Sequence, residues 1–423
     1  MDEDGRTKEK IESWRTLVHV CRQWRSAVFE SPRRLNLRLV CTSVTPARDT
    51  LDVWPALPLV IQCHGPIVSM DDIVAVLERS NRVCQIELRN LSSSCLKTVS
   101  AAMQEPFPEL TDLELKSNDE TMPVLLGPFL GGSAPCLRSL ELGGIPFPGL
   151  PKLLLSATHL VTFRFERIPH SGYFSPQAIL SALSTLTSLK TLWLEFESPR
   201  SCPDLASRRP PPPTRFILPA LTYFFFQGVS EYLDDLVAGI EAPRLCAFYI
   251  TFFNQIVFDT PQLIQFIGRT PSSNALQNAH FIFSDSIATV RLSSRTSELE
   301  VKVSCRELDW QISSLEQVCT SCLPPLSTLE VLYIYGASSM RADRPDKIEK
   351  TLWLELLLPF TTVTKLYLSD EFAQGVVPAL RERGGTIEVL PTLQNIFLKA
   401  PAYRDLSRKA FSNLLPRDRP VTP

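Results

Sequence analysis

The sequence is poor in glycine and has almost no excess charge of either sign. Glycine accounts for 16 of 423 residues. No P-loop, G-x-G-x-x-G or G-x-S-x-G motif occurs, which argues against a phosphate-binding loop and a hydrolase nucleophile elbow. Lysine and arginine total 43 against 45 aspartates and glutamates, so the net charge is -2. This balance creates no field that would gather nucleic acid or an anionic membrane, and we expect neither partner.

Long apolar runs and a signal segment are also missing. The most apolar stretch, Leu352 to Phe360, contains Glu355 and is far shorter than the roughly 20 residues of a membrane span. The N-terminus is charged, and the eleven cysteines are odd in number and irregularly spaced. We therefore expect reduced thiols and a cytoplasmic or nuclear protein.

Residue patterns typical of catalysis or metal binding are scarce. The five histidines form no H-E-x-x-H motif. Cys319-x-x-Cys322 has the spacing of half a zinc site, but no second ligand pair follows, so we interpret both as structural thiols. Adjacent carboxylates such as Asp234 and Asp235 carry no geometric signal of an acid–base pair. We expect no catalytic residues, no metal and no cofactor. An enzyme of unrecognised kind ranks third among the functional hypotheses, after two kinds of interaction protein.

The chain does contain a recurring unit of three apolar positions. Two variable residues separate the first position from the second, and one variable residue separates the second from the third. The units are Val83/Ile86/Leu88, Leu110/Leu113/Leu115, Leu137/Leu140/Leu142, Leu160/Phe163/Phe165, Leu189/Leu192/Leu194, Leu221/Phe224/Phe226, Leu245/Phe248/Ile250, Leu276/Ala279/Phe281, Leu329/Leu332/Ile334, Val363/Leu366/Leu368 and Leu393/Ile396/Leu398. From Val83 to Leu276 successive units begin 23 to 32 residues apart. The unit resembles the leucine-rich repeat, L-x-x-L-x-L.

The alternation within each unit predicts a short strand, and the segments between units predict helices or irregular returns. We therefore expect an α/β fold: a leucine-rich-repeat-like solenoid whose strands pair in a parallel ladder, in chain order. The 53-residue step from Leu276 to Leu329 indicates a degenerate unit or a hairpin through Val290, Leu292, Val301 and Val303. The alternative is an α/β domain whose strands share the pattern by chance.

Near the N-terminus, the apolar spacing of residues 14–28 predicts an amphipathic helix bounded by Pro32. The stretch LVHVCRQWR, residues 17–25, resembles the second half of an F-box, whose core reads L-x-x-V-C-(R/K)-x-W before a proline and a leucine. With the loose repeats, the chain looks like the large F-box family of mushroom-forming fungi (basidiomycete-type). The apolar Leu-Pro-led first half of an F-box is missing before this helix.

This resemblance implies that the helix binds the Skp adaptor of a cullin-based ubiquitin ligase and that the repeats hold the protein to be ubiquitinated. The adaptor-binding residues that it implies are Trp14, Leu17, Val18, Val20, Cys21, Trp24, Pro32 and Leu35. The alternative is that these apolar residues only cap the open end of the repeat core.

Strand side chains alternate, so the residues between the apolar positions should form a second, outward row. From Trp193 onward this row gathers aromatics, which dominate binding hot spots. The predicted partner-binding residues are Trp193, Tyr223, Phe225, Tyr249, Tyr333, Tyr335 and Tyr367. The alternative places residues 223–226 in a strand buried on both faces.

The sequence thus predicts three regions: a partial F-box-like helical segment at 1–40, the solenoid at 41–399 and a flexible or disordered tail at 400–423. The expected function is substrate recognition for an SCF-type (Skp-cullin-F-box) ubiquitin ligase. The alternative is a leucine-rich-repeat interaction scaffold without ligase coupling. The basic polyproline stretch at 208–213 is interpreted as a stiff loop, with an SH3-type ligand as its alternative.

Overall fold

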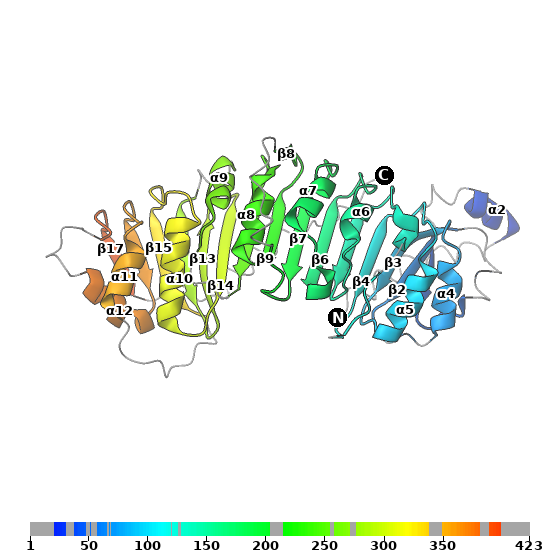
Figure 1. The fold of residues 1–423 in the computed structure, drawn as a ribbon, viewed down its shortest axis with the longest axis horizontal. Coiled ribbons are helices and arrows are strands. Elements are labelled where there is room, and N and C mark those ends of the chain that lie inside the picture. Colours follow the sequence, from blue (N-terminus) through cyan, green and yellow to red (C-terminus); the bar gives the residue numbers. More distant parts are fainter. Residues whose placement is uncertain are drawn as a thin grey trace. The chain divides into compact units, whose positions relative to one another are not determined.

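The computed structural model shows a mixed α/β fold with long sheets dominated by parallel pairing (Figure 1). It describes residues 21–30, 38–47, 51, 57–65, 67, 69–119, 121–125, 128–203, 215–253, 258–270, 276–337, 349–380 and 389–398. The chain divides into two compact units. Unit 1 comprises Met1–Gly228 and Asp235–Arg244, and unit 2 comprises Val229–Asp234 and Leu245–Pro423.

In unit 1 the strands of the main sheet pair side by side in chain order, all in parallel: β1-β2-β3-β4-β5-β6-β7-β9. These strands are β1 (Leu39–Thr42), β2 (Leu59–Cys63), β3 (Val83–Leu88), β4 (Asp112–Lys116), β5 (Ser139–Gly143), β6 (Thr162–Ile168), β7 (Thr191–Phe196) and β9 (Tyr223–Gly228). A separate parallel pair joins β8 (Phe216–Ile217) to β10 (Ile240–Glu241).

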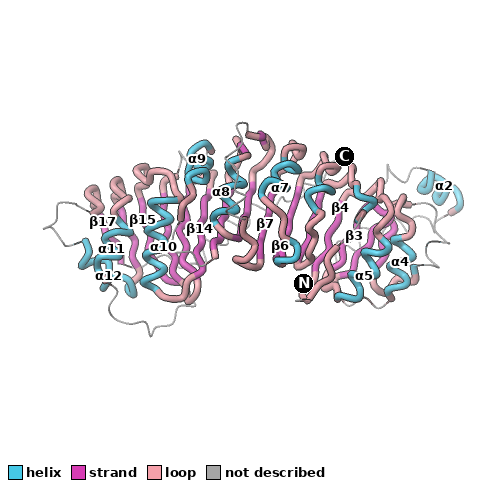
Figure 2. The backbone as a smooth tube through the Cα atoms, viewed as in Figure 1, coloured by secondary structure: helices cyan, strands magenta, loops and turns pink. Residues whose placement is uncertain are grey.

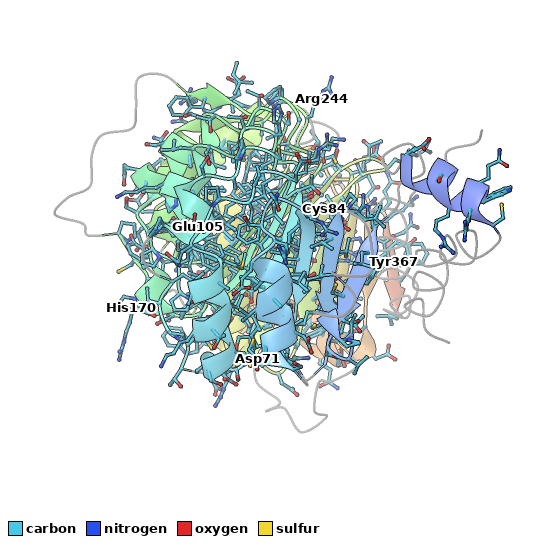
Figure 3. The ribbon with its side chains drawn as sticks, turned by 90° about the vertical axis from the view of Figure 1, so that its right-hand side faces the viewer. Asp71, Cys84, Glu105, His170, Arg244 and Tyr367 are labelled. Atoms are coloured by element: carbon cyan, nitrogen blue, oxygen red, sulfur yellow. The ribbon has the colours of Figure 1, made fainter. Side chains whose placement is uncertain are left out.

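The helical elements between these strands line one side of the sheet (Figure 2). They are α4 (Met70–Leu77), α5 (Ser93–Ala102), η1 (Phe129–Gly132), α6 (Leu150–Leu154), η2 (His170–Gly172) and α7 (Pro176–Leu183); α8 (Ser230–Ala238) follows β9. Figure 3 looks along unit 1, with Asp71 on α4 and Cys84 on β3. Serine caps begin three of these helices: the hydroxyls of Ser69, Ser92 and Ser175 each accept a backbone N–H three residues later.

The apolar units form the core between this sheet and its helices. In every unit of the sequence pattern from Val83 to Phe226, the three apolar positions are buried, for example Leu137, Leu140 and Leu142. The strand alternation predicted for these units is confirmed. Strands β1 and β2 were not predicted, because they lack the alternation that marks the other strands. In both strands successive residues are buried, including Val40 and Val60.

Helix α2 (Arg22–Glu30) is the described part of the predicted N-terminal helix. Trp24 is 51% exposed and Cys21 is exposed too. Residues 1–20 and 31–37 lie outside the described part of the chain, and the predicted tail at 400–423 does so as well.

Unit 2 contains β11 (Ala247–Phe252), α9 (Pro261–Arg269), β12 (Asn278–Phe283), β13 (Ile287–Ser293), β14 (Glu298–Ser304), α10 (Leu308–Ser321), β15 (Val331–Gly336), α11 (Lys350–Leu357), β16 (Lys365–Leu368), α12 (Asp370–Leu380) and β17 (Asn395–Leu398). Its strand order is β11-β14-β13-β12-β15-β16-β17. The expectation of chain order throughout is therefore wrong in this unit.

The departure is an antiparallel meander of β12, β13 and β14 that runs backward through the sheet. Its predicted hairpin is present, with Val290 opposite Val301 and Leu292 opposite Leu299. Strand β14 pairs with β11 in parallel, and β12 pairs with β15 in parallel. Every other described junction in this unit follows the predicted parallel pattern.

The last predicted unit differs from the others. Strand β17 continues the parallel register of β16, yet all four of its residues are exposed, including Ile396 and Leu398 at the predicted core positions. The pattern therefore predicted the strand correctly and its burial wrongly. Within the described residues, no helix is both long and apolar enough to cross a bilayer.

Candidate functional site

The sheet face opposite the helices, called the outer face below, carries the polar and aromatic row predicted from the alternation. In unit 1, an ionic row spans β3 to β6 and consists of Glu87, Arg89, Glu114, Lys116, Glu141 and Glu166. Arg89 links Glu87 at 2.7 Å with Glu114 at 2.8 Å. All six side chains are partly exposed, so each pair contributes modestly to stability.

Lys116 is the centre of this row. Its ammonium lies 3.2 Å from Glu114, 3.2 Å from Glu141 and 3.3 Å from Glu166, which belong to three successive strands. Burial opposes its charge, but the three carboxylates outweigh burial and raise the pKa of Lys116. Gly143 makes this reach possible: a Cβ at Gly143 would lie 3.0 Å from Cγ of Lys116, so the lysine stem lies across the bare glycine.

The aromatic end of the unit 1 outer face lies on β6, β7 and β9. The guanidinium of Arg164 sits 4.6 Å above the Trp193 ring, and Phe225 stacks on Trp193 with 3.8 Å between ring centroids. Trp193 Nε1 donates a hydrogen bond to Glu195 at 3.1 Å. Burial, followed by the nearby Glu166 and Glu197, raises the pKa of Glu195 although this hydrogen bond lowers it.

In unit 2 the meander holds a more buried ion cluster. Glu300 is only 2% exposed, and it pairs with Arg291 and with Lys302, each at 2.5 Å. Arg291 also contacts Glu298 at 3.1 Å, and the Tyr249 hydroxyl donates to Glu298 at 3.1 Å. Burial opposes the charge of Glu300, but the two cations outweigh it and lower its pKa.

Beside this cluster four rings form a stack, called the ring ladder below: His280, Tyr333, Tyr367 and Phe397. The rings occupy equivalent positions on β12, β15, β16 and β17. Their centroids are 4.3, 4.7 and 4.6 Å apart, with interplanar angles of 4°, 13° and 15°. This spacing matches the strand separation of a sheet, so the rings stand upright and stack along the ladder.

Such a stack fixes which part of each ring a partner could touch. Tyr333 uses both faces, one against His280 and the other against Tyr367. Its half-buried ring therefore presents an edge rather than a flat face to the outside. At Tyr333 the outer face is thus suited to edge contacts and hydroxyl hydrogen bonds rather than to stacking a planar ligand.

His280 is the buried start of the ring ladder. Its Nδ1 has no hydrogen-bond partner in the described structure, and burial, helped by the neighbouring Arg291, lowers its pKa to about 4. The imidazole is therefore neutral at pH 7. It acts as a flat stacking surface for Tyr333.

Comparison with known proteins gives no match, either to a family model or to a curated protein. Inference about function therefore depends on the residues of this chain.

The predicted partner-binding residues mostly have the expected exposure. Trp193, Tyr223, Phe225, Tyr249, Tyr333 and Tyr367 are half-buried; their binding role stays a prediction. The alternative that residues 223–226 are buried on both faces is wrong, since Tyr223 and Phe225 remain partly exposed. Tyr335 is a correction: it is only 3% exposed. It pairs in register with the buried Ile282 on β12, and the His280 ring lies edge-on to it at 6.2 Å.

Of the predicted adaptor-binding residues, the structure describes Cys21 and Trp24, both exposed. The others, Trp14, Leu17, Val18, Val20, Pro32 and Leu35, lie outside the described residues.

The Cys319 and Cys322 thiols lie in the core of unit 2, where burial raises the pKa of Cys322 to about 12 and that of Cys319 as well. The Thr260 hydroxyl lies 3.2 Å from Cys322 Sγ. Buried, protonated thiols neither bind zinc readily nor act as nucleophiles. In the described part of the chain, no group of His, Cys, Asp and Glu residues could hold a metal ion.

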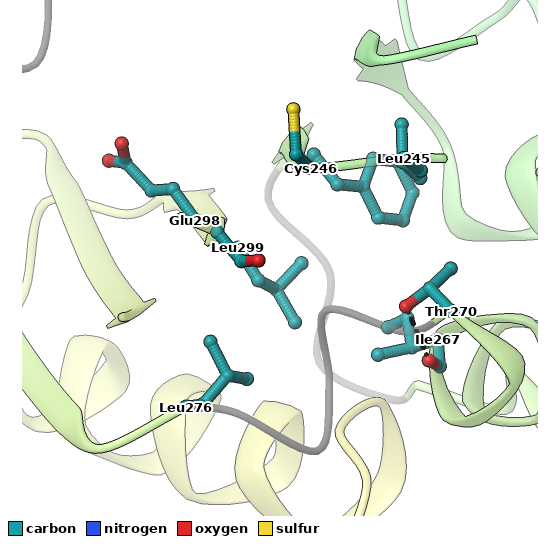
Figure 4. A pocket seen from close by; sticks show the side chains of 9 residues that line it. Leu245, Cys246, Ile267, Thr270, Leu276, Glu298 and Leu299 are labelled. Atoms are coloured by element: carbon teal, nitrogen blue, oxygen red, sulfur yellow. Dashed lines mark hydrogen bonds between the residues drawn. The ribbon is translucent and has the colours of Figure 1, made fainter. Parts of the chain in front are cut away.

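A small cavity of about 20 Å³ lies beside the first residues of β11, between Leu245, Leu276 and Leu299 (Figure 4). A volume of this size holds about one water molecule. The Glu298 carboxylate at its rim is already engaged by Arg291 and Tyr249. The cavity is therefore too small for a substrate.

Sequence reasoning missed part of the outer face. Alternation alone would have placed Glu87 and Glu141 there, because each lies between two buried apolar positions. The cluster of Arg291, Glu298 and Glu300 needs the register of the β13–β14 hairpin, in which Arg291 lies opposite Glu300, and alternation within one strand does not give that register.

Proposed function

We propose that this chain is a non-enzymatic interaction protein, a leucine-rich-repeat-like solenoid that holds a protein partner on its outer face. The observation that carries the proposal is the row of half-buried ring edges and ion pairs on the sheet face opposite the helices that connect the strands. Aromatic edges with hydroxyls give large contact area at low entropic cost. The buried apolar units supply a rigid support.

We further propose that the partner is a substrate of an SCF-type ubiquitin ligase, with the N-terminal helix binding a Skp-type adaptor of the cullin complex. The F-box-like sequence at 17–25 supports this, and so does the exposure of Trp24 on α2 and of Cys21 just before it, since a docking residue must be accessible. A cytoplasmic or nuclear location belongs to the same proposal.

The adaptor arm is tested with the purified chain and a purified Skp adaptor by calorimetry. Trp24→Ala together with Leu17→Ala should abolish binding, because truncating two anchors costs several kcal/mol. Gln23→Ala, on the exposed part of the same helix, is the matched control and should bind normally. No binding by the unmodified chain would favour the scaffold alternative.

The binding face is tested by photo-crosslinking in cells. A photoreactive phenylalanine in place of Tyr367 on the outer face should form a discrete adduct, whereas the same group in place of the exposed Lys152 on α6 should not. Equal adducts from both positions would place binding elsewhere. Adducts that also carry ubiquitin would distinguish a ligase substrate from a scaffold partner.

A further inference from the structure

The helical side of unit 2 carries a hollow at the start of α10 and α11. The hollow is open to solvent and has a volume of about 400 Å³. Its walls include Asp309, Trp310, Ser313 and Gln317 from α10, with Glu349 and Leu352 at the start of α11. The α10 residues recur at helical spacing, so they line one side of that helix.

The charged residues that line this hollow are acidic within the part of the chain that the structure describes. Asp309 and Glu349 both line it, and among the described residues no lysine or arginine does. The acidic character continues along the two helices: burial raises the pKa of Glu316, and Glu355 on α11 raises it further. The carboxylates of Glu316 on α10 and Glu355 on α11 thus lie close enough to repel each other.

An aromatic surface adjoins these carboxylates. Trp310 is 50% exposed on the first turn of α10, unlike Trp353 on α11, which is fully buried. An accessible indole beside carboxylates can stack on a planar cation while the carboxylates accept its hydrogen bonds. The guanidinium group of arginine has both properties, and it is less strongly hydrated than an ammonium group.

We propose that this hollow binds an arginine side chain from a basic segment of a partner protein, stacked on Trp310 and held by Asp309 and Glu349. The hollow lies on the helical side of unit 2. It is therefore separate from the outer face, and the proposal does not depend on the function assigned to that face.

The test uses the full chain labelled with 5-fluorotryptophan and the peptide acetyl-Gly-Ser-Arg-Gly-Arg-Ser-Gly-amide as the probe. The Trp310 ¹⁹F resonance is assigned through Trp310→Phe. It should shift on titration with this peptide, and the shift should weaken as salt is raised, because the attraction is electrostatic. The same peptide with citrulline in place of arginine keeps the shape without the charge and should produce no shift.

The variant arm removes charge and keeps shape. Asp309→Asn with Glu349→Gln should weaken binding about tenfold or more, since two charge-assisted contacts are lost. Glu330→Gln, an exposed carboxylate in the same unit, is the matched control and should leave affinity unchanged. The Trp193 resonance on the outer face should not move in any of these titrations.

Three results would overturn the proposal. The arginine and citrulline peptides could shift Trp310 equally, or the double variant could bind as well as the unmodified chain. Binding could also emerge only after Arg341, Arg344 and Lys347 are replaced together by serine, which would assign the hollow to the chain's own basic segment.

Discussion

The outer faces of the two units use equivalent strand positions for different kinds of contact. In unit 1, Lys116 shares its charge among three partly exposed carboxylates, one on its own strand and two on the next two strands. In unit 2, Arg291 and Glu300 form a buried pair, followed by stacked rings from His280 onward. The ionic row of unit 1 is open to water and salt, whereas the cluster of unit 2 is largely shielded from both.

Because of this difference, the two faces should tolerate amino-acid substitution to different degrees. A half-exposed ion pair can be replaced by water at little cost, while a buried charge that loses its partner keeps its full desolvation penalty. Substitutions in the ionic row of unit 1 should therefore cost less stability than substitutions in the Arg291–Glu300 pair of unit 2.

The largest expected effect comes from the buried pair. Arg291→Met should lower the free energy of unfolding by about 3–5 kcal/mol, because Glu300 would stay buried with only Lys302 as a cation. Urea unfolding followed by circular dichroism measures this. A loss below about 1 kcal/mol would show that the cluster of unit 2 is no more demanding than the ionic row of unit 1.

The pH dependence of unit 2 should come next. The pKa of His280 is about 4 in the folded chain and 6.5 for the unperturbed group, so only the unfolded chain binds a proton between these values. Stability should therefore be unaffected above pH 6.5 and should fall by up to about 3 kcal/mol as pH drops toward 4. Arg291, Tyr333 and Tyr335 are its close neighbours. His280→Phe keeps a stacking ring and should remove this component of the slope; an unchanged slope would assign it to other groups.

The ring ladder should give a smaller loss. Tyr333→Ala removes two stacked contacts and should cost roughly 2 kcal/mol, because each aromatic pair contributes about 0.5–1.5 kcal/mol beyond burial. This exceeds the effect of an ordinary surface substitution. Tyr333→Phe keeps the stack and should leave the melting temperature nearly unchanged while weakening partner capture. Equal stability losses in both variants would show that the hydroxyl, rather than the stack, is the structural element.

The smallest effect is expected in the ionic row. Lys116→Met should cost about 1 kcal/mol or less, since its partners are partly exposed and remain hydrated. The difference from the unmodified chain should shrink further as salt is added. A loss comparable with that of Arg291→Met, measured by the same urea unfolding, would remove the contrast between the two faces.

Much of this fold could be predicted from the sequence because burial on one face imposes a period of two. Leu140, Leu192 and Leu366 were assigned to the core from spacing alone, and all three are buried. The order of strands in the meander could not be predicted, since alternation describes one strand and carries no information on its neighbours. The exposure of Ile396 was misjudged for a related reason, because the pattern of one strand carries no information on what packs against it.

The sequence predicted on which face of its strand each site residue lies, but not how deeply its side chain is buried. Alternation placed Tyr333 and Tyr335 on the same face, yet only Tyr333 remains accessible. What separates them is the neighbouring strand, because Tyr335 lies beside Ile282. The ring ladder was likewise hidden, since His280 and Tyr333 are far apart in sequence and meet only through the register of β12 and β15. How deeply a side chain is buried depends on the residues of the neighbouring strands, and the pattern of a single strand does not identify those residues.

The meander has a consequence for how such a chain can grow. Because it contains an odd number of strands, its first and last members point the same way, and both flanking strands, β11 and β15, meet a parallel neighbour. The parallel pairing of the flanking strands is therefore the same as it would be without the inserted hairpin. The direction of the strand that meets each neighbour stays the same whenever two antiparallel strands are added or removed together. Removal of one such hairpin should therefore leave β11 and β15 able to pair with parallel neighbours.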